Sequence, residues 1–594
     1  MRQFFKFVFA SMLGTFLMGI VLIFIFIGML AALGASLGSS KKMTTVKDGS
    51  VLQLTFDQAI VDRGAENDFD LDLGPFQGEK TIGLNHVLAS LEHAKTDDHI
   101  EGIFLDLSFV SGGFATLKEI REKILEFKKE SGKPVVAWAE MYSQGTYYVA
   151  TAADAIYLQP KGELDYRGFQ SESMFLKGMF EKLDIDIQFI RGSNNRFKSY
   201  GEMYTQDSMS AANELQIKMI LDDFWADHRA AVAAKTGLEA ARLDLIADSL
   251  MVRNDDAALE LKLVDGLKYR DEVLADLKER MSLAADDDIA FVSLGKYTRS
   301  FTEKSTKSKD HVAIIYAEGG ISSGDGEDGI GSTTLSATIR EAREDSTVKA
   351  IVFRVNSPGG SGLASEVIWR EVKLASEAKP VVVSMGNVAA SGGYYISCPA
   401  TKIYAEPTTI TGSIGVFGMI PNMKGFFKNK LGITFDGTKT HKYADMMTVS
   451  RPLTAQEKRI IQGYVDDFYS GFVERVAEGR KLTHAQVDSI GQGRVWSGVD
   501  AKERGLVDEL GGLEDAIKAA ASLAGLTDYA KVELPKQEDF FKKLMKELNG
   551  DAQAWVAKEY LGEDMQLLEQ YKRIRDVRNY SGIQARMPFD LVIQ

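Results

Sequence analysis

The sequence predicts two tandem α/β domains with mainly parallel sheets, because strands alternate with helices and the two halves of the chain share one pattern. The segment beginning at Asp97 (DDHIEGIFLDLSFVSGGFATLKEI) aligns with the one beginning at Asp345 (DSTVKAIVFRVNSPGGSGLASEVI). Each reads as a buried apolar strand, a Gly-Gly turn and an amphipathic helix. Such alternation is typical of βαβ units with right-handed crossovers.

The repeat extends through most of each half. GKPVVAWAEMYSQGTYYVATAADAIYLQP matches AKPVVVSMGNVAASGGYYISCPATKIYAEP, and LVDGL at Leu263 matches LVDEL at Leu506. The offset of about 245 residues far exceeds a solenoid period, so a whole domain is duplicated. A polar stretch, SFTEKSTKSKDH, marks the join. We therefore expect a membrane anchor, two repeats and an amphipathic helical tail, at residues 1–45, 46–300, 301–535 and 536–594.

The N-terminal region contains a long apolar run. Residues 7–38 carry no charge, which exceeds the roughly 20 apolar residues that cross a bilayer. We expect one transmembrane helix in contact with lipid; the alternative is a cleaved signal peptide, since AALGAS offers small residues. Lysine and arginine flank both ends, so the positive-inside rule gives no orientation. A large body after a short N-terminus is expected to lie outside the cytoplasm.

Composition excludes several classes of function. A net charge of −14 argues against nucleic acid as a partner, because phosphate binding requires a basic face. The seven histidines show no close metal-ligand spacing, so neither a metal nor another cofactor is expected. Cys398 is the only cysteine, which rules out an intramolecular disulfide and is typical of a small buried hydrophobe.

The two repeats differ at one chemically informative position. Aligning Tyr147 with Tyr394 sets Ser391 of ASGGYY opposite Gln144 of SQGTYY, so only the second repeat has a hydroxyl there. Ser391 follows a predicted strand and opens a predicted helix, where backbone N–H groups favour a developing oxyanion. The alternative is that Ser391 only caps that helix.

A glycine-rich turn strengthens the functional interpretation. Pro358 fixes the turn in NSPGGSG, and its two glycines let backbone N–H groups approach a bound carbonyl. A Gly-Gly turn alone is more often only a turn, but this one follows a buried strand about 30 residues before ASGG. Gly360 and Gly392 are the candidate oxyanion donors.

A serine nucleophile needs a base, and no histidine falls within these motifs. A lysine must be desolvated to act as a base near neutral pH, so the base should be partly buried. Two lysines occupy corresponding places in the repeats: Lys198 in RGSNNRFKSYGEMYT and Lys442 in DGTKTHKYADMMT. These residues alone leave both candidates open.

Three ordered motifs carry a family resemblance. VNSPGGSG, MGNVAASGGYY and ITGSIGVFG resemble the long, duplicated form of the signal peptide peptidase A family, peptidase family S49, which has a ClpP/crotonase-like fold. The resemblance covers residues 50–535 and the anchor. It implies a serine protease and a homotetramer, acting on peptides such as signal peptides. It also implies a single-pass protein of the bacterial inner membrane with its body in the periplasm.

The resemblance also implies residue roles. Ser391 matches the nucleophile, and the FKS segment matches the place where the first repeat of the family presents its lysine, which favours Lys198. Ser413, in ITGSIGV, matches a second serine that holds the lysine. Short relatives place their base in a segment resembling that of Lys442, but across paired repeats Lys442 would face the unreactive Gln144.

Two rival functions remain open at this point. A crotonase-like acyl-CoA hydratase or isomerase would also use glycine-rich oxyanion loops, although no carboxylate catalyst is evident. A non-catalytic membrane scaffold would not depend on the hydroxyl of Ser391.

Overall fold

The computed structural model describes most of both repeats: residues 44–64, 81–107, 110–284, 286–301, 308–326, 329–536 and 583–587, with residues 6–7, 11–19 and 21. Most of the apolar run at residues 7–38 lies outside these described residues. Among the helices that are described, none has the length and hydropathy needed to cross a bilayer.

The first half of the chain forms a six-stranded sheet in which every pairing is parallel. Its central strands are buried on both faces, which explains their nearly continuous apolar sequences. In order across the sheet the strands are β8 (Gly266–Leu267), β6 (Ala155–Leu164), β5 (Val135–Tyr142), β4 (Ile100–Asp106), β1 (Ser50–Leu54) and β9 (Ala290–Ser293).

The second half repeats this arrangement in an eight-stranded sheet, parallel except where β17 meets β19. The prediction of a mixed α/β fold with mainly parallel sheets is thus confirmed. The strands run in the order β19 (Val495–Ser497), β17 (Ile410–Gly412), β15 (Val381–Ala390), β13 (Val348–Ser357), β10 (His311–Glu318) and β21 (Ala530–Leu534), with β16 (Lys402–Ala405) and β20 (Glu509–Leu510) branching from β15.

A third sheet, which the repeat pattern did not predict, combines strands from distant parts of the chain. It brings β7 of the first half against β18 of the second, and the C-terminal strand β22 between β18 and β14. Its order is β12 (Ile330–Gly331), β11 (Ile321–Ser322), β14 (Gly359–Ser361), β22 (Ile583–Arg586), β18 (Phe417–Asn422) and β7 (Asp186–Arg191); β2 (Ala59–Val61) and β3 (Thr81–Gly83) form a separate pair.

The C-terminal region therefore departs from expectation where the structure describes it. We predicted a helical tail over residues 536–594, but residues 583–586 form a strand. The rest of that predicted tail, from residue 537 to 582 and from 588 onward, lies outside the described residues. Pairing with strands on both sides explains why these four residues are extended.

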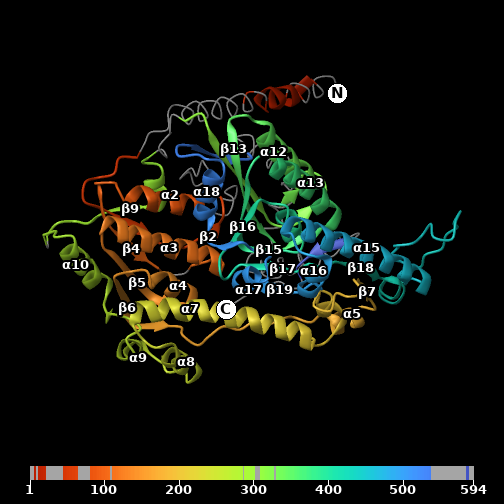
Figure 1. Ribbon diagram of the computed structural model, residues 1–594, viewed down its shortest axis with the longest axis horizontal. Helices are drawn as coiled ribbons and strands as arrows, with labels where there is room; N and C mark the ends of the chain where they lie inside the picture. Colours follow the sequence, from red (N-terminus) through yellow and green to blue (C-terminus); the bar gives the residue numbers. More distant parts are fainter. Residues whose placement is uncertain are drawn as a thin grey trace.

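Helices cover both faces of each large sheet, and the two repeats lie side by side (Figure 1). One face of the first sheet packs on α10 and one face of the second packs on α18. The first half contributes α2 (Leu84–Ala94), α3 (Phe114–Ser131), α4 (Gln144–Ala150), α5 (Lys177–Lys182), α6 (Glu202–Thr205), α7 (Ala211–Thr236), α8 (Ala240–Asp248), α9 (Asp255–Glu260), α10 (Arg270–Arg280) and α11 (Leu294–Thr298).

The second half contributes the corresponding set and one short π-helix. These are α12 (Ser332–Glu344), α13 (Gly362–Ala378), α14 (Gly392–Ser397), η2 (Phe426–Lys430), α15 (Ala455–Arg480), α16 (His484–Ile490), α17 (Gly498–Glu503) and α18 (Leu513–Leu523).

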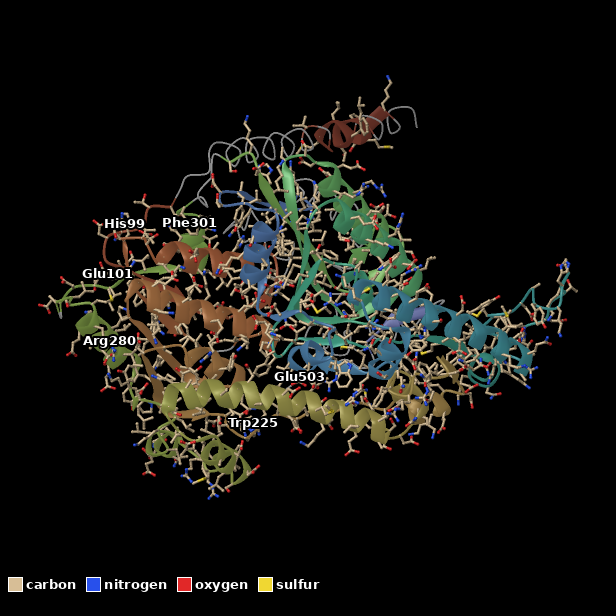
Figure 2. The ribbon with its side chains drawn as sticks, in the orientation of Figure 1. His99, Glu101, Trp225, Arg280, Phe301 and Glu503 are labelled. Atoms are coloured by element: carbon tan, nitrogen blue, oxygen red, sulfur yellow. The ribbon has the colours of Figure 1, made fainter. Side chains whose placement is uncertain are left out.

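Helix α7 bridges the two halves along one side of the molecule (Figure 1). Toward its C-terminal half, helix α7 carries Trp225, which is labelled in Figure 2. Trp225 stacks on His228 and donates a hydrogen bond of 2.8 Å to Asp244 on α8. Toward its N-terminal half, Ile217 and Ile220 pack against strands of the second repeat. One helix thus fixes the first repeat against the second.

A buried ion network also joins the repeats. Arg354 lies in the middle of β13, and its guanidinium is 2.7 Å from Asp62 and 2.7 Å from Glu119, both in the first half. Glu119 also accepts a 2.7 Å hydrogen bond from the backbone N–H of Leu513. Because Arg354 and both carboxylates are buried, each charge depends on the others for compensation.

We predict that Arg354→Ala destabilises the protein by about 3–5 kcal/mol, because it leaves two carboxylates buried without their cation. The matched control is Arg340→Ala, which breaks a pair with Glu371 in which the arginine side chain is 50% exposed. That change should cost at most about 1 kcal/mol. Urea unfolding measures both, and equal losses would contradict the assigned role of the network.

Candidate active site

Ser391 stands at the junction of β15 and α14 in a strained backbone conformation. Its φ of 57° and ψ of −113° are unfavourable for a residue with a side chain. The Ser391 N–H donates a 2.8 Å hydrogen bond to the Gly412 carbonyl, which holds the turn against β17. Strain that is held in place in this way is typical of functional positions.

Lys198 reaches this serine from the other repeat. Its Nζ lies 2.8 Å from Ser391 Oγ, 2.8 Å from Ser413 Oγ and 3.2 Å from the Ser413 carbonyl oxygen. The three side chains have no exposed surface. The structure therefore brings together Ser391, Lys198 and Ser413, which the sequence had placed in three separate motifs.

The surroundings of Lys198 favour the neutral amine. Desolvation by burial holds the pKa of Lys198 well below 10.5, and its polar contacts named above are hydroxyl and carbonyl oxygens. A carboxylate partner would stabilise the charged form and oppose this shift. An amine that is neutral near physiological pH can accept a proton from the adjacent Ser391 hydroxyl.

Contacts with both repeats fix the lysine segment. The Phe197 N–H donates a 3.0 Å hydrogen bond to the Gln492 carbonyl, and Gln216 on α7 donates one of 3.2 Å to the Phe197 carbonyl. Gly493 has a φ of 79°, and a Cβ there would lie 2.6 Å from the Cβ of Lys198. Neither Gln216 nor Gly493 was predicted from the sequence, where the glycine-rich run GQGR was the available signal.

Ser413 is held as firmly as the residues it contacts. Its φ is 49°, and its N–H donates a 2.6 Å hydrogen bond to the Arg494 carbonyl. Its hydroxyl lies 3.4 Å from the Gly493 carbonyl, in addition to its contact with Lys198. Ser413 is therefore placed to orient the amine of Lys198.

Lys442, the alternative base, lies in a different environment. Its side chain is exposed and donates a 2.6 Å hydrogen bond to Gln456. It also lies over the ring of Tyr443, 5.0 Å from the ring centroid. Nothing around it desolvates the ammonium as burial desolvates that of Lys198.

The glycine turns meet close to Ser391. A Cβ at Gly359 would lie 2.6 Å from the Gly392 nitrogen, so the two turns are in close contact at this pair. Gly360, the glycine expected from the sequence, pairs with Ile321 of β11 in the parallel ladder. Gly359, its neighbour in the Gly-Gly pair, donates its N–H to Ser357 Oγ at 3.2 Å. Gly360 and Gly392 remain the predicted oxyanion donors.

The corresponding position of the first repeat is closed. The side-chain amide of Gln144 makes two hydrogen bonds with the backbone of Gly168, of 2.8 and 3.0 Å. The backbone carbonyl oxygen of Gln144 lies 3.0 Å from His228 Nε2. At the position that corresponds to Ser391, the first repeat thus has a side chain that is held in a structural contact. Cys398 is completely buried, and burial raises the pKa of its thiol.

Comparisons with known proteins agree with the division of the chain into two repeats. Residues 127–284 and 373–527 match the model of peptidase family S49, one segment in each half. The chain is 37% identical over 456 residues to Protease 4 of Salmonella typhi, covering 75% of this chain and 73% of the relative. The chain belongs to peptidase family S49. It is also 33% identical to the chloroplastic serine protease SPPA of Arabidopsis thaliana, over 82% of this chain and 71% of the relative.

A solved ClpP1 mutant from Listeria monocytogenes shows a weaker likeness, with 17% identity and a TM-score of 0.24. The match covers 34% of this chain and 94% of the ClpP1 chain, and the likeness is too distant to bear on the fold. As a member of peptidase family S49, the chain is a serine protease with peptide substrates. Lys198 falls in the first matched segment, and Ser391 and Ser413 fall in the second.

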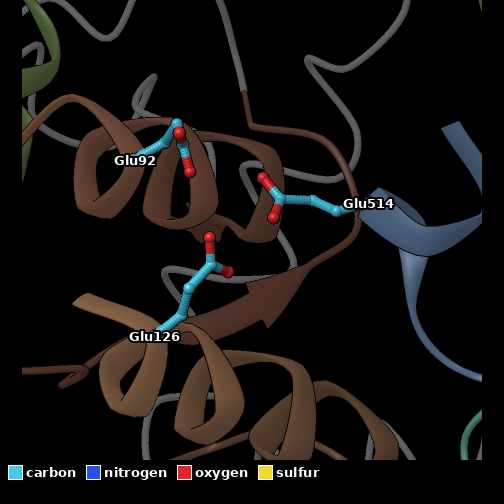
Figure 3. A group of neighbouring side chains, drawn as sticks. All are labelled: Glu92, Glu126 and Glu514. Atoms are coloured by element: carbon cyan, nitrogen blue, oxygen red, sulfur yellow. The ribbon is translucent and has the colours of Figure 1, made fainter. Parts of the chain in front are cut away.

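An acidic cluster lies elsewhere, at the seam between the repeats. Glu92, Glu126 and Glu514 point toward one another from α2, α3 and α18, with one oxygen of each within 4.8 Å of the others (Figure 3). The Lys123 ammonium contacts all three carboxylates, at 3.2 Å from Glu126 and 2.7 Å from Glu514. Lys95 adds a second ammonium, 2.7 Å from Glu92 and 2.6 Å from Glu126. The cluster is therefore an ion-pair joint between the repeats.

Proposed function

We propose that this family S49 protease is a membrane-anchored endopeptidase that works through a dyad of Ser391 and Lys198. The observation that carries the proposal is the 2.8 Å separation of Lys198 Nζ and Ser391 Oγ across the two repeats. Burial of the amine, strain at the serine and the nearby glycine turns give the same pair the properties that acyl transfer requires.

The proposed reaction begins when neutral Lys198 takes the proton of the Ser391 hydroxyl while Oγ attacks a peptide carbonyl carbon. Gly392 and the Gly359–Gly360 turn stabilise the oxyanion. The peptide C–N bond then breaks, and Lys198 returns the proton to the departing amine. Water, deprotonated by Lys198, attacks the acyl ester; the ester C–O bond breaks and Ser391 regains its proton. Ser413 positions the amine throughout.

The membrane location forms the second part of the proposal. Residues 7–38 form the anchor, which holds the body on the periplasmic side of the bacterial inner membrane as a homotetramer. Signal peptides released within that bilayer are the proposed substrates, because an enzyme tethered there meets them at high effective concentration. The uninterrupted apolar length of the run supports the anchor.

Membership of a peptidase family disfavours the rival acyl-CoA chemistry. Burial of an amine costs free energy, and a non-catalytic scaffold would gain nothing from burying Lys198 beside Ser391. The burial therefore disfavours the scaffold.

Three substitutions compared side by side test the dyad. Ser391→Ala and Lys198→Ala should each lower kcat/KM for a peptide substrate at least about a thousandfold, because each removes a group needed for acyl transfer. Lys442→Ala, the matched control, should stay within about twofold. An inactive Lys442→Ala with an active Lys198→Ala would show that the base is assigned wrongly, and three active variants would refute the mechanism.

Alkaline carbonate extraction of bacterial membranes tests the anchor. The full chain should remain in the membrane pellet, and a chain lacking residues 7–38 should be released. Protease added to spheroplasts should then digest the body of the full chain from the periplasmic side. Release of the full chain by carbonate would contradict the proposed anchor.

A further inference from the structure

A cleft of about 510 Å³, here called the seam cleft, lies between the two repeats. Its walls are α2 and α3 of the first repeat, and β20, α18 and the turn after β16 of the second. Figure 3 shows part of this seam, where Glu514 of α18 faces Glu92 and Glu126. The volume falls in the range of small-molecule sites and far exceeds the roughly 30 Å³ of a single water molecule.

Most carboxylates on these walls already have a partner. Three cationic side chains provide the contacts, at 2.7 to 3.2 Å: Arg354 for Glu119, Arg121 for Glu122, and Lys123 for both Glu126 and Glu514. Asp515 is exposed to water and accepts a 3.1 Å hydrogen bond from the Gly512 N–H. None of these groups needs a ligand to compensate its charge.

Glu406 is the exception on the wall of the seam cleft. Its residue is only 5% exposed, yet in the part of the chain that the structure describes its carboxylate has no hydrogen bond and no ion pair. The backbone around it is fixed, because the Glu406 N–H donates a 3.0 Å hydrogen bond to Thr409 Oγ. Burying a carboxylate without a partner costs free energy, which a ligand of opposite charge would offset.

The charges around Glu406 do not replace such a partner. Burial, and then the Glu119 carboxylate, raise the pKa of Glu406 well above its usual value, and Asp227 adds to this shift. Lys118 and Arg354 oppose the shift, but Lys118 lies 3.0 Å from Asp227 and Arg354 lies 2.7 Å from Glu119. Without a ligand, Glu406 therefore tends to keep its proton, which a bound cation would displace.

The rest of the wall indicates which kind of cation fits. Leu88, Pro407 and Leu510 offer apolar surface, which suits methylene groups. Mg²⁺ and Ca²⁺ instead take about six or more oxygen ligands. The three glutamates of Figure 3 already contact the ammonium groups of Lys95 and Lys123. The cleft therefore favours an organic cation over a metal ion.

We propose that the seam cleft binds a small linear diamine, with one ammonium group paired with Glu406 and the methylene groups packed on Leu88 and Leu510. The second ammonium group can pair with the exposed Asp515. Because both repeats form the walls, the bound ligand holds the repeats together and stabilises the folded protein. The inference does not depend on the proposed dyad, because Ser391 and Lys198 are not part of these walls.

Calorimetric titration of the purified full chain tests the site, with 1,4-diaminobutane as the probe. One control is 1,4-butanediol, which has the same length without charge; the other is Mg²⁺, which has the same charge without methylene groups. The diamine should bind and raise the melting temperature, since it binds the folded state alone. The diol should not bind, and Mg²⁺ should bind at least about tenfold more weakly.

Absence of diamine binding would overturn the inference. Binding of Mg²⁺ as tight as that of the diamine would also overturn it, because general attraction to a chain with a net charge of −14 would then explain both. Binding of the diol as tight as that of the diamine would do the same, because the charge of Glu406 would then play no part.

Glu406→Gln in the full chain should raise the Kd of the diamine at least about tenfold, because it removes the charge and keeps the shape. The matched control is Glu341→Gln, which removes the same charge from an exposed position of α12 outside the cleft. It should change the Kd less than about twofold. Equal effects of the two substitutions, or unchanged binding to Glu406→Gln, would overturn the inference.

If Glu406→Gln does not fold, Leu510→Lys replaces it, at an exposed position of the wall. The added ammonium should weaken binding of the diamine about tenfold by repulsion, and unchanged binding would overturn the inference. These measurements do not use peptidase activity. Their failure would therefore leave the proposed dyad intact, and an inactive dyad would leave the diamine site intact.

Discussion

Desolvation of one amine is the constraint on which the site depends. Lys198 Nζ has two hydroxyls and a carbonyl oxygen as partners, so burial lowers its pKa with no anion to restore the charge. An exposed lysine would be protonated at neutral pH and could not accept a proton from serine. The strained turn at Ser391 and the close packing of Gly493 both serve to bring a serine hydroxyl to this buried amine.

The second constraint is that the proposed base, Lys198, and the proposed nucleophile, Ser391, come from different repeats. The distance between them therefore depends on how the two repeats dock. Three features hold the repeats together: the ion network around Arg354, the contacts of Lys123 and the packing of α7 on both repeats. In the proposed mechanism neither repeat is active alone. At the corresponding position of the first repeat, Gln144 makes two hydrogen bonds with the backbone of Gly168 instead.

Much of this was accessible from the sequence, because repeated strands and turns are local patterns. The contrast between Ser391 and Gln144 needed only an internal alignment. The buried ion network around Arg354 was not predicted. Its partners Asp62 and Glu119 could not be predicted, because the docking of the repeats decides them. The strand at residues 583–586 was missed for a similar reason: four residues carry little periodicity, and pairing with β14 and β18 makes them extended.

The pH dependence of kcat/KM tests the central claim most directly, because it reports the ionisation of the free enzyme. In the proposed mechanism the neutral form of Lys198 is the base, so activity should rise with pH and reach half its maximum well below 10.5. Lys198→Arg should be inactive throughout, because arginine remains protonated. A wild-type profile that rises only near 10.5, or an active arginine variant, would contradict a buried neutral lysine as the base of this protease.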